Sequence, residues 1–198
     1  MTAWWLRPGR AWCAVAGLLA AGSALALAAP PLALDWQPQL AAREPWRAFS
    51  AAFVHYSALH VIGNAAGLSL TAAYGWVARV PLRSALAWLV AWPLTQLGLL
   101  VQPGLLHYGG VSGVVHAGVA IVTLYVILAG YRWVGGTVMA MLFVKLATES
   151  PWGAPLQFVP GWDIALAPVS HATGVGAGLL CCAAAEALAR HGPQRTPS

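Results

Sequence analysis

Six long apolar stretches, separated by short segments that hold most of the polar residues, dominate the hydropathy pattern of this chain. A helix needs about 20 mostly apolar residues to cross the hydrocarbon core of a bilayer. The pattern therefore predicts an all-α membrane protein, a bundle of six transmembrane helices with short connections. These helices are expected at residues 11–34, 57–78, 84–101, 111–130, 133–148 and 164–189.

The composition agrees with a membrane protein. Hydrophobic residues make up 60% of the 198 positions and charged residues 8%, whereas soluble domains carry roughly a quarter charged residues. The net charge of +5 comes from ten basic and five acidic residues. In such a chain basic residues report orientation in the bilayer rather than a nucleic-acid partner. We therefore expect the lipid bilayer as a partner and no nucleic acid.

The first apolar run has two interpretations. Arg7 and Arg10, followed by an apolar run with an alanine-rich end, resemble a cleaved signal peptide. The run is too long for that, so a retained helix is expected. The chain has no internal repeat, and residues 1–189 are predicted to form one membrane domain. Residues 190–198 are predicted to be a disordered cytoplasmic tail.

The basic residues predict the orientation. Most of them lie in the terminal segments and in the second and fourth connections: Arg7, Arg10, Arg79, Arg83, Arg132, Arg190 and Arg195. With six helices these segments share one side, which the positive-inside rule makes cytoplasmic, with both termini on it. On the other side, Asp35 and Glu44 balance Arg43 and Arg47 in a long first loop.

Aromatic residues and cysteines receive structural interpretations. Trp46 and Arg47 are expected to anchor the first loop at the lipid headgroups, and tryptophans near helix ends, including Trp12 and Trp36, to form an interfacial belt. The three cysteines lie in apolar stretches without disulfide or metal spacing, and they are expected to be small packing residues: Cys13, Cys181 and Cys182.

Four polar residues lie at one depth in the predicted bundle. His60 and Asn64 share one face in the first turns of the second helix, Ser112 opens the fourth, and His171 lies in the first third of the sixth. All three helices run from outside to inside, so these residues meet near the outer end. Polar side chains within spans are costly and mark functional sites, and the shared depth predicts a single site.

The residue types predict nucleophilic catalysis. A serine hydroxyl becomes a good nucleophile when a neighbouring base accepts its proton, and neutral histidine is the usual base. Ser112 and His171 are therefore the candidate catalytic pair. The oxyanion formed by attack on an amide needs donors, which the Asn64 amide, the His60 imidazole and a backbone N–H of Ser112 or Gly113 are expected to supply.

Small residues permit this pair to meet. Gly174 and Gly178 form a GxxxG face below His171, and Gly113 with Ala117 offers a matching face on the fourth helix, so close helix packing is expected.

No orienting carboxylate is evident, so a dyad is expected. Asp163 is placed about 12 Å from His171 along the predicted helix. Glu186 lies at the opposite end, where pairing with Arg190 is expected. Lys145 is expected to snorkel or to pair with Glu149 at i+4.

In order and spacing, these residues resemble the rhomboid family of intramembrane serine proteases. The matching stretches are residues 53–64, with the HxxxN core of His60 and Asn64, residues 110–113 for GxSG, residues 171–178 for HxxGxxxG, and residues 44–47, similar to the family's Trp-Arg motif. The resemblance implies a six-helix rhomboid-like fold, Ser112 as nucleophile, His171 as general base, and His60 and Asn64 in the oxyanion hole. His55 aligns with a further histidine that is taken as structural.

A narrower resemblance concerns the substrate. The short six-helix form, His116, and the stretch from Lys145 to Glu149 look like the rhombosortase subgroup. This implies single-pass membrane protein substrates with a C-terminal Gly-Gly before a membrane anchor, cleaved at the periplasmic side of a bacterial inner membrane. Hydrolysis and transfer to an amine acceptor both stay open. No cofactor or metal is expected.

Two other functions are considered. His55, His60, His116 and His171 in one bundle suit ligation of haem or a transition metal, but such a site has no need for Ser112 or its glycines. A rhomboid-like protein that binds membrane helices without cutting them is expected to lack the serine or the histidine, and this chain has both. His107 and His116 are placed near the site, as a loop residue and a core contact that can touch substrate.

Overall fold

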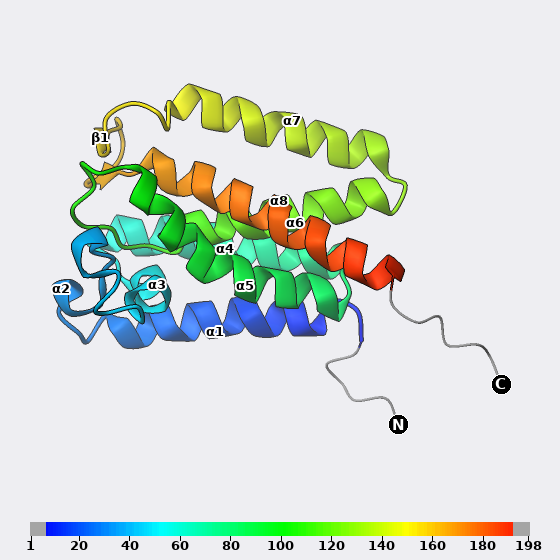
Figure 1. Cartoon of the computed structure of the whole chain (residues 1–198), viewed down its shortest axis with the longest axis horizontal. Coiled ribbons are helices and arrows are strands. Elements are labelled where there is room, and N and C mark those ends of the chain that lie inside the picture. Colours follow the sequence, from blue (N-terminus) through cyan, green and yellow to red (C-terminus); the bar gives the residue numbers. More distant parts are fainter. Residues whose placement is uncertain (1–6, 192–198) are drawn as a thin grey trace.

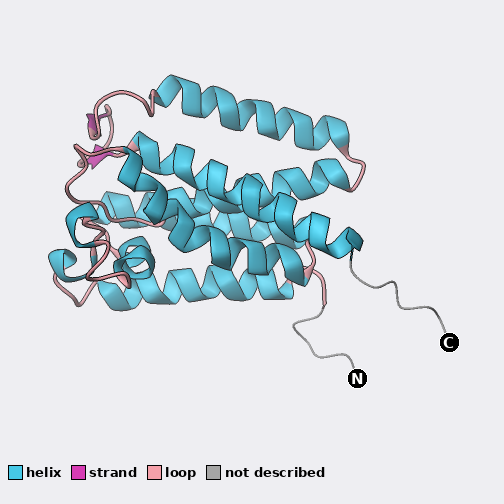
Figure 2. Cartoon of the chain, viewed as in Figure 1, coloured by secondary structure: helices cyan, strands magenta, loops and turns pink. Residues whose placement is uncertain are grey.

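The computed structural model describes residues 7–191, which form a bundle of long helices (Figures 1 and 2). The prediction of an all-α fold is confirmed, and the long helices fall where the apolar stretches predict them. These are α1 (Arg10–Ala26), α4 (Ala58–Val77), α5 (Leu82–Gly98), α6 (Ser112–Leu128), α7 (Arg132–Glu149) and α8 (Pro168–His191).

Within the described residues, two helices are long and apolar enough to cross a membrane, at Leu82–Val101 and Pro168–His191. Arg10–Ala26 and Ser112–Leu128 are shorter apolar helices. Of the predicted tail, Arg190 and His191 are the last residues of α8, and residues 192–198 with Arg195 lie outside the described part of the chain.

The connections at one end of the bundle contain short elements (Figure 1). These are α2 (Pro31–Leu34), η2 (Pro38–Leu40), α3 (Arg47–Ser50), η3 (Ala51–Phe53), η4 (Leu99–Val101), β1 (Gln157–Phe158) and β2 (Ala165–Leu166). The two strands form an antiparallel pair in which Gln157 faces Leu166 and Phe158 faces Ala165. The start of α1 and the end of α8 lie at the opposite end.

Prolines account for two wrong boundaries. The first helix ends at Ala26 and does not continue to residue 34: Pro30 disfavours helical geometry in the residue before it, and Pro31 starts the separate helix α2. The last helix starts at Pro168 rather than at residue 164, with proline in the first turn, where its missing N–H has no cost. Asp163 is therefore not on α8 but in the hairpin between β1 and β2.

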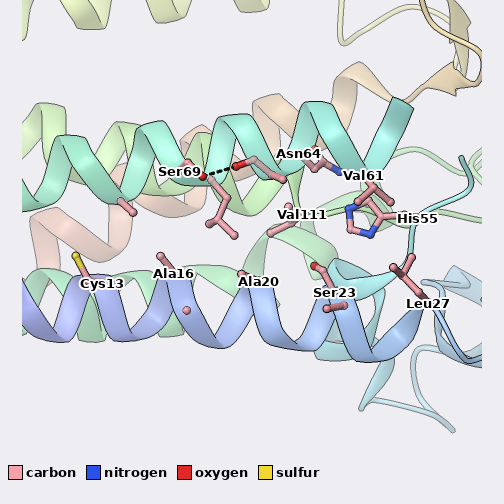
Figure 3. A pocket seen from close by; sticks show the side chains of 15 residues that line it. Cys13, Ala16, Ala20, Ser23, Leu27, His55, Val61, Asn64, Ser69 and Val111 are labelled. Atoms are coloured by element: carbon pink, nitrogen blue, oxygen red, sulfur yellow. Dashed lines mark hydrogen bonds between the residues drawn. The ribbon is translucent and has the colours of Figure 1, made fainter. Parts of the chain in front are cut away.

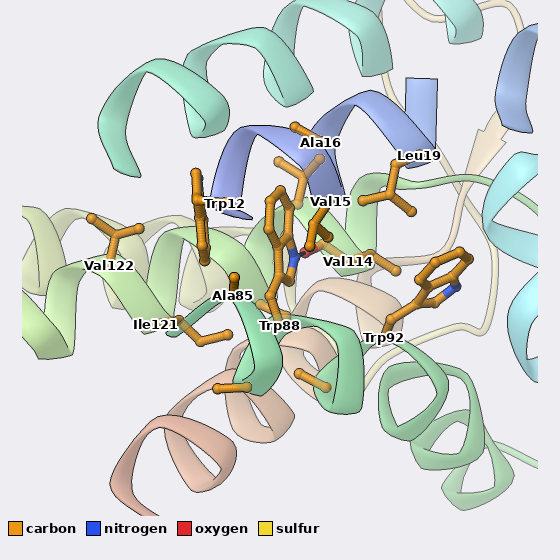
Figure 4. Packing of buried hydrophobic residues seen from close by; sticks show 14 of the residues in the cluster. Trp12, Val15, Ala16, Leu19, Ala85, Trp88, Trp92, Val114, Ile121 and Val122 are labelled. Carbon is orange, nitrogen blue, oxygen red and sulfur yellow. Dashed lines mark hydrogen bonds between the residues drawn. The ribbon is translucent and has the colours of Figure 1, made fainter. Parts of the chain in front are cut away.

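The core contains tryptophans that were expected at the membrane interface. Trp12 of α1 and Trp88 of α5 are fully buried and stack with ring centroids 4.1 Å apart (Figure 4). The Trp12 indole donates to the Thr71 carbonyl at 2.9 Å and the Trp88 indole to the Val114 carbonyl at 2.7 Å. The stack therefore joins α1, α4, α5 and α6. Trp36 is also fully buried, so the belt prediction is wrong for Trp12 and Trp36.

Arg47 braces the first loop instead of reaching the headgroups. The residue is 6% exposed, and its guanidinium donates to the Asp35 carbonyl at 2.8 Å and to Glu44 Oε2 at 2.5 Å. The Asp35 carboxylate is fully buried and also accepts from Tyr56 and His107. Burial, reinforced by the negative charge of Asp35, raises the pKa of Tyr56. A buried carboxylate with these partners ties the loop to the segments that flank the site.

Helices α6 and α8 pack backbone against backbone. A Cβ atom on Gly174 would overlap the carbonyl of Gly113, and one on Gly178 would overlap the carbonyl of Ala117. Helix α8 is also held to α5 at its far end, where Arg83 donates to both carboxylate oxygens of Glu186 at 2.7 and 3.1 Å. The expected pairing of Glu186 within its own helix is thus wrong.

Gly174→Ala is expected to separate α6 from α8, because its methyl group has no room beside the Gly113 carbonyl. Overpacking of this kind typically costs about 1–3 kcal/mol, so we expect a lower thermal unfolding midpoint in detergent. Gly176→Ala is the matched control, since a Cβ there meets nothing within 4 Å. Equal midpoints for the two variants would contradict the packing described.

Candidate active site

Ser112 and His171 meet at the end of the bundle that carries the short elements. Ser112 is the first residue of α6 and His171 lies in the first turn of α8. Ser112 Oγ is 3.1 Å from His171 Nε2, a hydrogen-bonding distance. The structure thus brings together the two residues that the sequence pairs as nucleophile and base.

The segment before Ser112 has a conformation that requires glycine. Gly110 has φ of 131°, and its N–H donates to the Ala51 carbonyl at 2.9 Å. A Cβ atom there would lie 2.7 Å from His60 Nε2. Upstream, Tyr108 pairs with Trp36 through two backbone hydrogen bonds of 2.7 and 2.9 Å. The first loop therefore sets the path by which the chain reaches Ser112.

His60 and Asn64 flank the same segment from α4. Both are buried, with 5% and 6% of their surface exposed. The Tyr56 backbone N–H donates to His60 Nδ1 at 3.4 Å. A neutral His60 then carries its proton on Nε2, the nitrogen beside Gly110. This nitrogen is a donor aimed at the chain just before Ser112.

The Asn64 amide nitrogen is buried without a hydrogen-bond partner among the described residues. A Cβ atom on Gly110 would lie 3.4 Å from it, so this donor also faces the segment before Ser112. Leaving a buried donor unpaired costs about 1–3 kcal/mol. An unpaired donor beside a nucleophile suits an oxyanion that is present only during reaction.

Gly113 lies in the α6–α8 contact. A Cβ on it would be 2.7 Å from the Ser170 carbonyl oxygen and 2.8 Å from Thr95 Cγ2. In the preceding loop the Tyr108 hydroxyl donates to the Gly110 carbonyl at 3.1 Å, and burial raises the pKa of Tyr108. Gly113 therefore serves close packing between α6 and α8.

The dyad expectation missed Glu149. This residue ends α7, and its Oε2 lies 2.7 Å from His171 Nδ1. Its other oxygen accepts from Lys145 Nζ, the i+4 pair that the sequence predicts. Helix α7 runs toward the end of the bundle that carries the short elements, so its last residue reaches the level at which Ser112 and His171 begin their helices (Figure 1). The same depth argument, applied to a helix ending at 149 rather than 148, identifies this carboxylate.

His116 covers one face of the His171 imidazole. Its ring stacks on that of His171 with centroids 4.1 Å apart and planes 15° apart. His116 Nδ1 lies 2.7 Å from the Ser112 carbonyl oxygen and donates to it. Because a carbonyl only accepts, this bond sets the orientation of His116, and the stacked ring limits rotation of His171.

The remaining predicted residues lie outside the catalytic contact. His55 bonds the Phe53 carbonyl at 3.0 Å, and burial lowers its pKa while that bond opposes the shift. Asp163 accepts from Ser57 at 2.7 Å and so ties the hairpin to α4. His107 bonds Asp35 at 2.8 Å. Among residues 7–191, no three His, Cys, Asp or Glu side chains are placed to hold a metal ion.

Two hollows adjoin Asn64. A largely apolar cavity of about 440 Å³ lies between α1 and α4, with His55 and Asn64 at one end (Figure 3). The other, a cleft of about 390 Å³, is lined by His60, Asn64, Ser112, Glu149 and His171. Neither Ser112 nor His171 lines the first cavity. His60, Asn64, Ser112 and His171 therefore share one cleft.

Comparison of the chain with protein-family models, curated proteins and solved structures finds no significant match.

Proposed function

We propose that this protein is a rhomboid-type intramembrane serine protease, in which Ser112 is the nucleophile and His171 the general base. The observation that carries the proposal is the 3.1 Å contact between Ser112 Oγ and His171 Nε2 across two apolar helices. The unpaired amide of Asn64 beside this contact supports it, because acyl transfer needs such a donor.

The chemical steps follow from the geometry. Ser112 Oγ attacks the carbonyl carbon of a peptide bond while its proton passes to His171 Nε2. The carbonyl π electrons move to the oxygen, where His60 Nε2–H and the Asn64 amide donate to it. Collapse of the tetrahedral intermediate breaks the C–N bond, and the leaving amine takes the proton from His171. Water, or an amine acceptor, then attacks the acyl-enzyme while His171 takes its proton. The C–Oγ bond breaks, and His171 returns the proton to Ser112 Oγ.

The proposed setting is a bacterial inner membrane crossed by all six long helices. The end that carries Ser112 faces the periplasm, and the end with the start of α1 and the end of α8 faces the cytoplasm. The distribution of basic residues supports this orientation. Membrane-anchored proteins are then the substrates, cut near the outer face, where the cleft and the hairpin lie.

A narrower proposal concerns the substrate class. The rhombosortase-like features of the sequence include His116 and the stretch from Lys145 to Glu149. In the structure His116 and Glu149 contact His171, and Lys145 contacts Glu149. Single-pass proteins with a C-terminal Gly-Gly before their membrane anchor are the proposed substrates.

Ser112→Ala and His171→Ala are expected to abolish two activities of purified protein. The first is cleavage of a membrane-anchored reporter that carries Gly-Gly before its anchor. The second is labelling by a fluorophosphonate, which reacts with activated serines whatever the substrate. Ser69→Ala and His191→Ala are matched controls, because Ser69 bonds only a carbonyl of its own helix and His191 lies exposed at the far end of α8. Labelling of Ser112→Ala at the wild-type rate would refute Ser112 as the nucleophile, and labelling without reporter cleavage would exclude only the Gly-Gly substrate.

Asn64→Ala is expected to lower kcat for the reporter by about 100- to 1000-fold, the typical loss for one oxyanion donor. The unfolding midpoint should hardly change, because the Asn64 amide nitrogen has no hydrogen bond to lose in the resting protein. Circular dichroism melting in detergent, measured beside turnover, checks both parts. A variant with lowered stability and unchanged kcat would show that Asn64 is structural.

A further inference from the structure

Glu149 occupies a position that is unfavourable for a carboxylate. It is the last residue of α7, where the helix dipole favours cations and opposes an anion. Burial adds to the cost, since only 24% of its side chain is exposed. Lys145 and His171 each take one of its oxygens. A half-buried acid at the wrong helix end, with both oxygens satisfied, calls for an explanation beyond helix stability.

The backbone after Glu149 holds it in place. Ser150 adopts a left-handed conformation with φ of 49°, which ends the helix directly after the acid. The Ser150 carbonyl accepts from the Gly153 N–H at 2.9 Å and from the Gln157 side chain at 3.2 Å. These hydrogen bonds fix the end of α7, and the Glu149 carboxylate there faces α8.

The contact with Glu149 determines which nitrogen of His171 carries the proton. A carboxylate only accepts, so His171 Nδ1–H is the donor in the 2.7 Å bond. A neutral His171 then presents a free electron pair on Nε2, 3.1 Å from Ser112 Oγ. This is the tautomer that a general base needs, and the carboxylate also stabilises the imidazolium formed when the Ser112 proton is transferred.

From this chain of contacts we propose that Glu149 is a positioning residue that acts through His171, so that the site works as a Ser–His–Glu triad rather than as a dyad. This inference rests on the proposed function of Ser112 and His171. Lys145 has a defined part in it: by bonding Oε1 it leaves Oε2 for the imidazole. His116 stacks on one face of the His171 ring and so holds the plane of that ring in line with Ser112 and Glu149.

Glu149→Gln tests the tautomer directly. Lys145 can only donate, so a glutamine there must turn its oxygen to Lys145 and its NH2 group to His171 Nδ1. That arrangement favours the proton on Nε2, the wrong tautomer. We expect kcat to fall by about 100- to 10,000-fold, with KM and the unfolding midpoint little changed and with slower fluorophosphonate labelling of Ser112. Glu149→Asp should recover part of the rate, because it restores an acceptor.

The double variant Lys145→Met/Glu149→Gln should be more active than Glu149→Gln alone. Without the ammonium group the amide is free to rotate and offer its oxygen to Nδ1. A double variant no faster than the single one would overturn the part assigned to Lys145.

Glu186→Gln is the control for loss of a helix carboxylate, since Glu186 pairs with Arg83 far from the site. It should lower the unfolding midpoint and leave kcat unchanged. The positioning role is overturned if Glu149→Gln keeps wild-type kcat while Ser112→Ala is inert, an outcome that leaves the protease proposal standing. It is also overturned if all Glu149 variants, including Asp, lose stability and activity equally. Full activity of Ser112→Ala would instead refute the proposed function.

Discussion

The contact between the backbones of α6 and α8 is the constraint on which the site depends. Gly174 and Gly178 of α8 lie against the carbonyls of Gly113 and Ala117, with no space for a side chain between them. The dispersion attraction between two helices is largest where their surfaces approach this closely. Because Ser112 and His171 lie in the first turns of these helices, the closeness of the two backbones sets the distance between Ser112 Oγ and His171 Nε2.

A second set of interactions, in the first loop, fixes the path of the segment that leads to Ser112 at the start of α6. Arg47 and Asp35 form a buried pair in the first loop, and the loop's Trp36 bonds the backbone of Tyr108. The cost of burying the Asp35 carboxylate is offset because each of its partners donates a hydrogen bond. Gly110 follows, close to His60, so a polar network outside the helix core places His60 and Asn64 beside the segment that leads to Ser112.

The sequence predicts well where each helix and each polar residue lies along the axis of the bundle. Hydropathy located the long helices, and the alternation of their directions placed His60, Asn64, Ser112 and His171 at one end. The errors concern charged side chains whose partners lie elsewhere in the tertiary structure. Glu186 was assigned to its own helix although Arg83 of α5 reaches it, and Arg47 was assigned to the headgroups although Asp35 binds it. Glu149 lies one residue beyond the predicted end of its helix at 148, so the depth argument did not include it.

The sequence by itself determined the helical class, the approximate helix limits and the depth of each polar residue, because apolar length and chain direction are properties of a single segment. Only the tertiary structure decided which side chains touch. Helix rotation and lateral order depend on packing between segments far apart in the chain, and hydropathy carries no record of them. The Ser112–His171–Glu149 alignment draws one residue from each of three helices, so it exists only once α6, α7 and α8 are packed.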